Sequence, residues 1–406
     1  MKKLLCFFAI ILFMFGSCFA QDEKLLAQAQ ELALQLKFDQ AETLCKRIIK
    51  DEPENLDAFS CLCGIYTKTG RFNLALFTIE EMKDLKADPG LISLLNGKIY
   101  MTAGNNTSAL KEFEALLNKE SPYYYEALLN SGIIYTRIKD YDKAYTLLNE
   151  TLNIKNIPQS STALSSLLIQ EKKYPEASNV LSEAIKENYS PALVNLAVID
   201  MKNNNSDTAK EKLNKALEYQ PYNLDAYYNL AVIDYDKGSY EDSIGNIYKI
   251  TDFNIFYPQA GYLMGKNLIA MGQLDEAYMY LNKAVTQYPD FFDAYMELGN
   301  LYIKEGNYEK AHIYLKKCME LNPADPNLQI LLGTLYFKEN NLDKAIECFK
   351  SALDKGSAKP DIYYNIAICY QIKKDKENAV KYYKEYLKIK PDSQDKDKIE
   401  NFIKKT

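Results

Sequence analysis

Residues that could carry out chemistry are scarce in this sequence. It has one histidine, His312, on the predicted solvent face of a helix, where a lone histidine is usually incidental. It has no H-E-x-x-H, C-x-x-C or G-x-S-x-G motif, and residues 261–266 (G-Y-L-M-G-K) are one residue too short for a phosphate-binding loop. The sequence therefore predicts that the chain is not an enzyme, with no catalytic residue, no metal site and no cofactor.

The cysteines give no sign of a reactive or metal-binding cluster. Those beyond residue 20 lie inside predicted helices, at positions that mostly take a small or apolar side chain: Cys45, Cys61, Cys63, Cys318, Cys348 and Cys369. A disulfide-stapled domain would carry denser cysteines in a loop-rich chain. We expect most of them to be buried free thiols that pack like small hydrophobic residues.

The element that positions all these residues is a repeat of about 34 residues. A small residue recurs at Ala41, Ala75, Ala109, Ala144, Ala177, Ala209, Ser243, Ala277, Ala311, Ala345 and Ala379. A second small residue precedes each of these by twelve positions, and an apolar residue follows each by four, as Gly299 and Leu315 do around Ala311. The pattern predicts two antiparallel helices per repeat, which cross where the side chains are small.

This pattern resembles the tetratricopeptide repeat family. The clearest unit spans residues 292–325, where the signature residues stand in register: Tyr295, Leu298, Gly299, Tyr302, Gly306, Tyr308, Ala311, Leu315 and Pro323. The resemblance covers residues 22–393 in units that start at 22, 56, 90, 125, 158, 190, 224, 258, 292, 326 and 360. It implies an all-α, right-handed superhelical solenoid of about eleven helix-turn-helix units.

Both ends of the chain differ from the repeats. Residues 394–406 place Ile399, Phe402 and Ile403 on one face, which predicts a capping helix over the last unit. Residues 1–20 combine Lys2 and Lys3 with an apolar run over residues 4–15, the pattern of a signal peptide.

The signal peptide predicts export to the periplasm or another extracytoplasmic location. Cleavage after Ala20 would leave a soluble protein that begins at Gln21, and this is the favoured reading. The alternative is a membrane-anchored lipoprotein with its lipid on Cys18, since residues 15–18 (F-G-S-C) resemble a lipoprotein box. A formal net charge of −6 argues against nucleic acid as a partner.

The resemblance also implies that the first helix of each repeat lines a concave groove that holds an extended peptide or a partner helix. The groove positions with aromatic, apolar or amide side chains are Asn195, Tyr228, Asn229, Tyr235, Tyr262, Met296, Ile303, Phe337, Tyr364 and Asn365, concentrated in residues 224–372. An apolar surface stripe marks an interaction site, whereas the same tyrosines could pack on neighbouring helices, and both roles stay open.

These features together predict a non-catalytic protein–protein interaction scaffold in the cell envelope or periplasm. The alternative is a binder of glycan or of another small envelope component, associated with polysaccharide or envelope assembly, because stacked tyrosines suit the faces of sugars.

Overall fold

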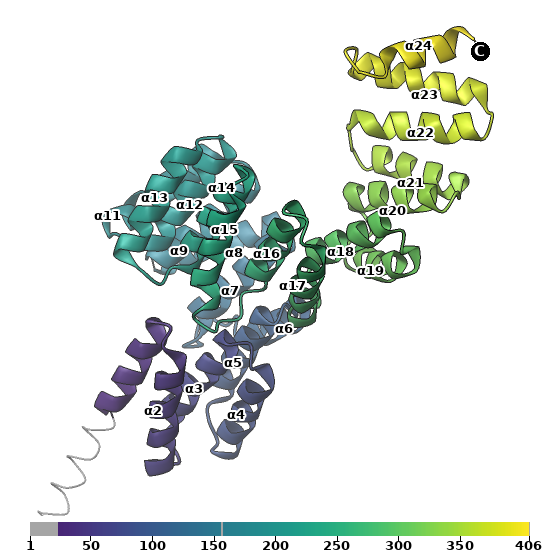
Figure 1. Cartoon of the computed structure of the whole chain (residues 1–406). Coiled ribbons are helices and arrows are strands. Elements are labelled where there is room, and N and C mark those ends of the chain that lie inside the picture. Colours follow the sequence, from purple (N-terminus) through teal and green to yellow (C-terminus); the bar gives the residue numbers. More distant parts are fainter. Residues whose placement is uncertain (1–22, 156, 406) are drawn as a thin grey trace, which may run out of the picture. The chain divides into compact units, whose positions relative to one another are not determined.

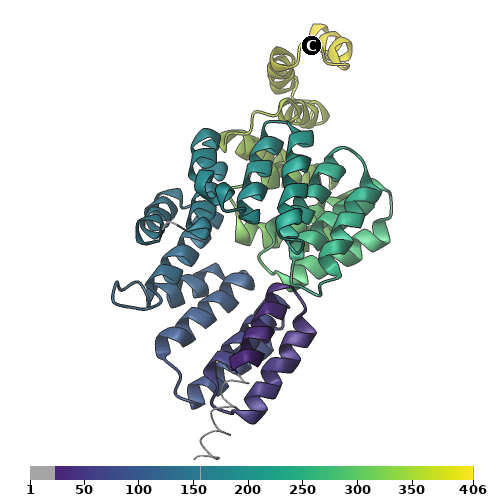
Figure 2. The same ribbon diagram turned by 90° about the vertical axis from the view of Figure 1, so that its left-hand side faces the viewer.

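Residues 23–155 and 157–405 are described by a computed structural model, and every regular element in these ranges is a helix. Successive helices pair as antiparallel hairpins that lie side by side (Figures 1 and 2). The predicted all-helical repeat fold is confirmed. The predicted signal peptide and Cys18 lie outside the described residues. None of the described helices is long and apolar enough to span a membrane.

Contacts along the chain divide it into two compact units, Met1–Ala277 and Tyr278–Thr406. In the first unit, the first helices of the hairpins are residues 23–34, α3 (Leu56–Lys68), α5 (Pro89–Thr102), α7 (Tyr124–Arg137), α9 (Pro158–Gln170), α12 (Ser190–Lys202), α14 (Leu224–Asp236) and α16 (Pro258–Ala270). The second helices are α2 (Phe38–Asp51), α4 (Phe72–Asp84), α6 (Asn106–Glu114), α8 (Tyr141–Ile154), α10 (Tyr174–Val180) with α11 (Ser182–Lys186), α13 (Ser206–Tyr219) and α15 (Tyr240–Thr251).

The boundary between the units falls within α17 (Leu274–Gln287). In the second unit the first helices are α18 (Phe292–Glu305), α20 (Pro326–Lys338) and α22 (Pro360–Ile372), and the second helices are α19 (Tyr308–Leu321), α21 (Leu342–Asp354) and α23 (Lys376–Ile389). The short helix α24 (Lys396–Lys404) packs against α23, and its Ile399 is buried with Tyr383 and Tyr386.

Local sequence signals explain where the helices begin and end. Six first helices begin with proline within their first two positions, where the missing N–H costs no hydrogen bond: α5, α9, α12, α16, α20 and α22. Asparagine or aspartate caps other helices, as Asn55 does by accepting a hydrogen bond from the Ala58 amide at 2.9 Å. Glycines such as Gly306, with φ 81°, end first helices in the left-handed conformation.

The two helices of a hairpin cross where the sequence is small. A Cβ atom added to Gly299 would lie 2.5 Å from the Leu315 side chain, and one added to Gly97 would lie 2.5 Å from the ring of Phe113. The same relation joins Gly333 to Phe349 at 2.6 Å. These contacts are far closer than atoms can pack, so the three glycines leave no room for a larger residue unless the facing side chain moves, in keeping with the small residues of the repeat pattern.

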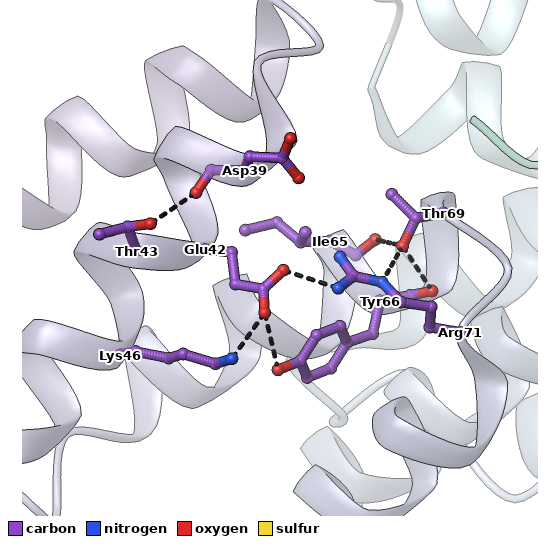
Figure 3. Close-up of polar contacts among 8 residues, drawn as sticks. All are labelled: Asp39, Glu42, Thr43, Lys46, Ile65, Tyr66, Thr69 and Arg71. Carbon is purple, nitrogen blue, oxygen red and sulfur yellow. Dashed lines mark hydrogen bonds and ion pairs between the residues drawn. The ribbon is translucent and has the colours of Figure 1, made fainter. Parts of the chain in front are cut away.

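Polar contacts join the first hairpin to the second (Figure 3). The Glu42 carboxylate on α2 lies 2.7 Å from Lys46 Nζ and 2.7 Å from an Arg71 guanidinium nitrogen, and it accepts a hydrogen bond from the Tyr66 hydroxyl at 3.3 Å. Arg71 also lies over the Tyr66 ring, 4.7 Å from its centroid. The Glu42 side chain is only 13% exposed, so this cluster is an internal joint between repeats.

Candidate functional site

The inner face of the first unit is formed by the first helices. Each of α3, α5, α7, α9, α12 and α14 approaches the first helix of the next hairpin, whereas successive second helices lie farther apart. A stack of hairpins with this spacing curves toward the more closely packed row. The first helices therefore line the concave side of the first unit.

A cavity of about 360 Å³ opens between α7 and α9 on this inner face. Its apolar lining comes from Leu129, Ile133 and Ala163, and its polar lining comes from Thr136, Gln159, Thr162, Ser166 and Tyr189. Apolar walls with a few polar groups are typical of sites that take one anchoring side chain of a partner. The cavity lies outside residues 224–372, where the sequence placed the groove site.

Asn195, one of the predicted groove residues, braces this cavity from α12. Its side-chain amide donates to the Thr162 carbonyl at 3.0 Å and lies 2.6 Å from Ser165 Oγ and 3.0 Å from Ser166 Oγ. Asn195 therefore fixes two residues of the cavity wall. Burial raises the pKa of the Tyr189 phenol, so this cavity-lining hydroxyl stays protonated.

The predicted tyrosines on α14 and α16 surround a lysine. Lys266 Nζ lies 4.5 Å from the centroid of the Tyr235 ring and 5.8 Å from that of Tyr262. A cation over aromatic faces is held by the charge distribution of the rings. The stripe that the sequence presents as apolar therefore carries a positive charge at its centre.

Tyr228 and Asn229, also on α14, have neighbours within the protein. The Tyr228 ring packs 5.7 Å from that of Tyr257, whose hydroxyl donates to the Asp225 carboxylate at 2.6 Å. Burial and the Asp225 carboxylate raise the pKa of Tyr257 well above its ordinary value. The Asn229 amide donates to the Asp225 carbonyl of its own helix at 2.7 Å.

In the second unit, several predicted groove residues serve helix packing. Ile303 is only 5% exposed, so the expectation that it lies on an accessible groove surface is wrong; it is part of the interior of α18. Phe337 packs against the core between α20 and α21, and the Tyr364 ring lies 5.1 Å from that of Tyr386. Met296 and Asn365 are half-buried on α18 and α22.

A second cavity, of about 550 Å³, lies in the second unit and is lined by residues of α19, α20 and α21. His312 is in its wall, with Nε2 2.9 Å from a Glu339 carboxylate oxygen and its ring 5.7 Å from that of Tyr336. Sequence reasoning missed this setting because it placed His312 only on a solvent face. Within the described ranges, no three His, Cys, Asp or Glu side chains come together to hold a metal ion.

Family profiles described as "Tetratricopeptide repeat" match residues 94–161, 194–252, 268–335, 305–356 and 360–393. These segments together cover more than half of the chain. The chain belongs to the tetratricopeptide repeat family. Such repeat proteins generally mediate protein–protein interactions, and their scaffolds are generally non-catalytic.

Curated relatives match this tetratricopeptide repeat chain over part of their length. A repeat-containing protein of Methanocaldococcus jannaschii is 25% identical over 209 residues, which are 47% of this chain and 37% of that protein. A BBSome complex member homolog of Drosophila melanogaster is 23% identical over 265 residues, which are 61% of this chain and 54% of that protein. A mouse protein O-mannosyl-transferase is 31% identical over 121 residues, only 12% of its length.

Solved structures with similar stacks of repeats include the Cut9–Hcn1 hetero-tetramer of the APC/C and pilF of Pseudomonas aeruginosa. The first is 13% identical and covers 93% of this chain and 95% of its own, with a TM-score of 0.47. The second is 21% identical and covers 53% of this chain and 98% of its own, also with a TM-score of 0.47.

Proposed function

We propose that this chain is an exported, non-catalytic scaffold that holds an extended peptide or a partner helix against the inner face of its first unit. The observation that carries the proposal is the cavity between α7 and α9, which combines apolar lining residues with the hydroxyl and amide groups of Thr136, Gln159 and Tyr189. An apolar side chain of a partner would pack on the apolar lining, and its backbone would bond to the polar groups.

The lysine between Tyr235 and Tyr262 supplies the second element of recognition on the same face. A cation held over two rings attracts a carboxylate and still leaves apolar ring edges for contact. This arrangement favours a peptide with acidic and apolar side chains. It argues against the glycan alternative, because Lys266 occupies ring surface on which a sugar would stack.

Crosslinking in cells, followed by mass spectrometry of the purified mature protein, tests the proposal. The decisive variant is Ala163→Trp, which fills the cavity, and its matched control is Ala115→Trp at an exposed position at the end of α6. We expect a defined envelope partner to be captured by the wild type and by the control but not by Ala163→Trp. Capture of no partner, or of the same partners by all three proteins, would contradict the proposal.

Two further measurements test its other parts. The intact mass of the exported protein distinguishes a chain that begins at Gln21 from one with lipid on Cys18. Retention on a polysaccharide resin that Tyr235→Ala and Tyr262→Ala abolish would instead support the glycan alternative.

A further inference from the structure

The connector between α15 and α16 has an unusual composition. Residues 252–257 read D-F-N-I-F-Y, with three aromatic residues among six, whereas connectors such as E-P-E-N at 52–55 and N-P-A-D at 322–325 carry none. Aromatic side chains in a connector are costly to leave in water. Their presence indicates that this segment is held against another part of the protein.

The connector docks on the turn between α3 and α4, in the second repeat. The Phe256 amide donates to the Lys68 carbonyl at 2.8 Å, and the Phe256 ring meets the Phe72 ring edge to face, with centroids 5.1 Å apart. Ile255 packs against the hydrophobic core of the first repeats. The contact thus joins residues that are far apart in sequence but lie within the first unit.

Gly70 leaves the space in which the Phe256 ring packs. A Cβ atom on Gly70 would lie 2.7 Å from a Phe256 ring carbon, and the backbone of Gly70 has φ 72°. Gly238 occupies the corresponding turn of a later repeat with φ 77°, yet a Cβ atom there would meet nothing within 4 Å. Gly70 is therefore required for space as well as for its turn conformation.

The other aromatic residues of the connector fasten it to its own repeats. The Phe253 ring packs edge to face on that of Tyr222, with centroids 5.9 Å apart, and the Tyr257 hydroxyl donates to Asp225. The segment between these two anchors has little freedom, so Phe256 is presented to the α3–α4 turn in one orientation.

We propose that the connector is an intramolecular latch: a segment that holds two distant repeats together through the packing of the Phe256 ring on the Gly70 turn. The latch links the second repeat to the end of α15 and so fixes the curvature of the inner face between them, where the α7–α9 cavity lies. One backbone hydrogen bond, the packing of Phe256 on Gly70 and Phe72, and the packing of Ile255 make a small docking area, which opens more readily than the repeats unfold. The inference concerns the conformation of the first unit and holds whether or not the inner face binds a partner.

Hydrogen–deuterium exchange of the full mature chain tests the latch. Phe256→Ala removes the ring that docks, and Gly70→Ala adds a methyl group where that ring packs. Each change should speed exchange about tenfold at both sites, the Phe256 amide and the turn over residues 66–72, because each site protects the other. Two controls separate docking from local damage. Gly238→Ala has the same backbone strain without the contact. Phe253→Ala removes a connector aromatic that packs on Tyr222 and lines a cavity beside residues 36–40, away from the Gly70 turn.

The controls should leave exchange at residues 66–72 at the wild-type rate. The double variant Gly70→Ala with Phe256→Ala should exchange no faster than either single variant, since both remove one contact. The latch would be refuted if Phe256→Ala sped exchange only within the connector, or if Gly238→Ala opened residues 66–72 as much as Gly70→Ala.

Discussion

Lys266 on α16 extends over the Tyr235 ring of α14, with 4.5 Å between its ammonium nitrogen and the ring centroid. The two helices belong to successive repeats, so this contact ties neighbouring first helices together on the inner face. The same ammonium group lies 5.8 Å from the centroid of the Tyr262 ring, so Tyr235 and Tyr262 share one cation.

Replacing Lys266 with methionine should loosen this joint. We expect Lys266→Met to weaken protection of α14 and α16 amides by about 0.5–1 kcal/mol in hydrogen exchange, and Lys266→Arg to retain it. Lys215→Met is the matched control, because Lys215 lies 5.9 Å from the Tyr219 ring of its own helix and ties no two helices together. Equal effects of the two methionine variants would show that the cation over Tyr235 contributes nothing between repeats.

Glycine at the helix crossing should be irreplaceable. Gly299→Ala forces a methyl group into Leu315, and overpacking of this kind costs about 1–3 kcal/mol. Gly245→Ala, within α15, meets nothing within 4 Å and should instead stabilise its helix by about 0.5–1 kcal/mol. Urea unfolding followed by circular dichroism checks the opposite signs, and a stabilising Gly299→Ala would contradict the crossing contact.

The Glu42 cluster predicts acid sensitivity in the first two repeats. Burial raises the pKa of Glu42, but hydrogen bonds and charge from Lys46 and Arg71 outweigh it and hold this pKa below its ordinary value of 4.5. The stabilisation is therefore complete above about pH 4.5, the unfolded value, and is lost as the pH falls through the lower folded value.

Glu42→Gln should accordingly cost about 1.5–3 kcal/mol at neutral pH, as expected for hydrogen bonds to a charged group, and progressively less in acid. Amide exchange in α2 and α3 as a function of pH measures the difference. Glu80→Gln, which removes an exposed pair with Lys83, is the control and should change little at any pH. A Glu42→Gln effect that does not shrink in acid would exclude the ion cluster as its cause.

The cysteines should differ in reactivity. A hydrogen bond from the Cys45 thiol, together with the charge of Lys68, outweighs burial and lowers the pKa of Cys61, which lines a cavity of about 390 Å³. Burial raises the pKa of Cys348, also partly exposed, to about 11. Because the thiolate is the reactive form, iodoacetamide at neutral pH should modify Cys61 first, as read by peptide mapping.

Two variants of Cys45 test whether its hydrogen bond contributes to the reactivity of Cys61. Serine still donates a hydrogen bond, so Cys61 should stay reactive, whereas Cys45→Ala removes the donor and should slow its modification. Modification of Cys348 before Cys61 would contradict the order.

The sequence predicts the repeat fold well because its signals are local. The position of Ala311 relative to Gly299 and Leu315 is set within one hairpin, and the structure confirms that crossing. The free, mostly buried cysteines follow from the same periodicity. Such features depend on neighbours a few turns away, which the repeat spacing specifies.

The site is less predictable because it depends on contacts between repeats. Asn195 shares a groove position with Asn229, yet one braces α9 while the other bonds to its own helix. The burial of Ile303 cannot be read from its register alone. The aromatic connector signals in the sequence that this segment docks on another part of the protein. That Phe256 docks on Gly70 depends on the curvature of the stack, which the sequence pattern does not specify.

The glycine crossings have a consequence for how this chain assembles itself. Gly97 receives a phenylalanine and Gly132 a leucine, while Ala197 leaves less space for its partner. In this part of the chain, a second helix that paired with the first helix of the adjacent repeat would therefore leave a hole or a clash. Similar hairpins that follow one another from the ribosome are prone to mispairing, and where adjacent repeats carry different couples, as Gly97 with Phe113 and Gly132 with Leu148 do, we expect each second helix to fit its own first helix best.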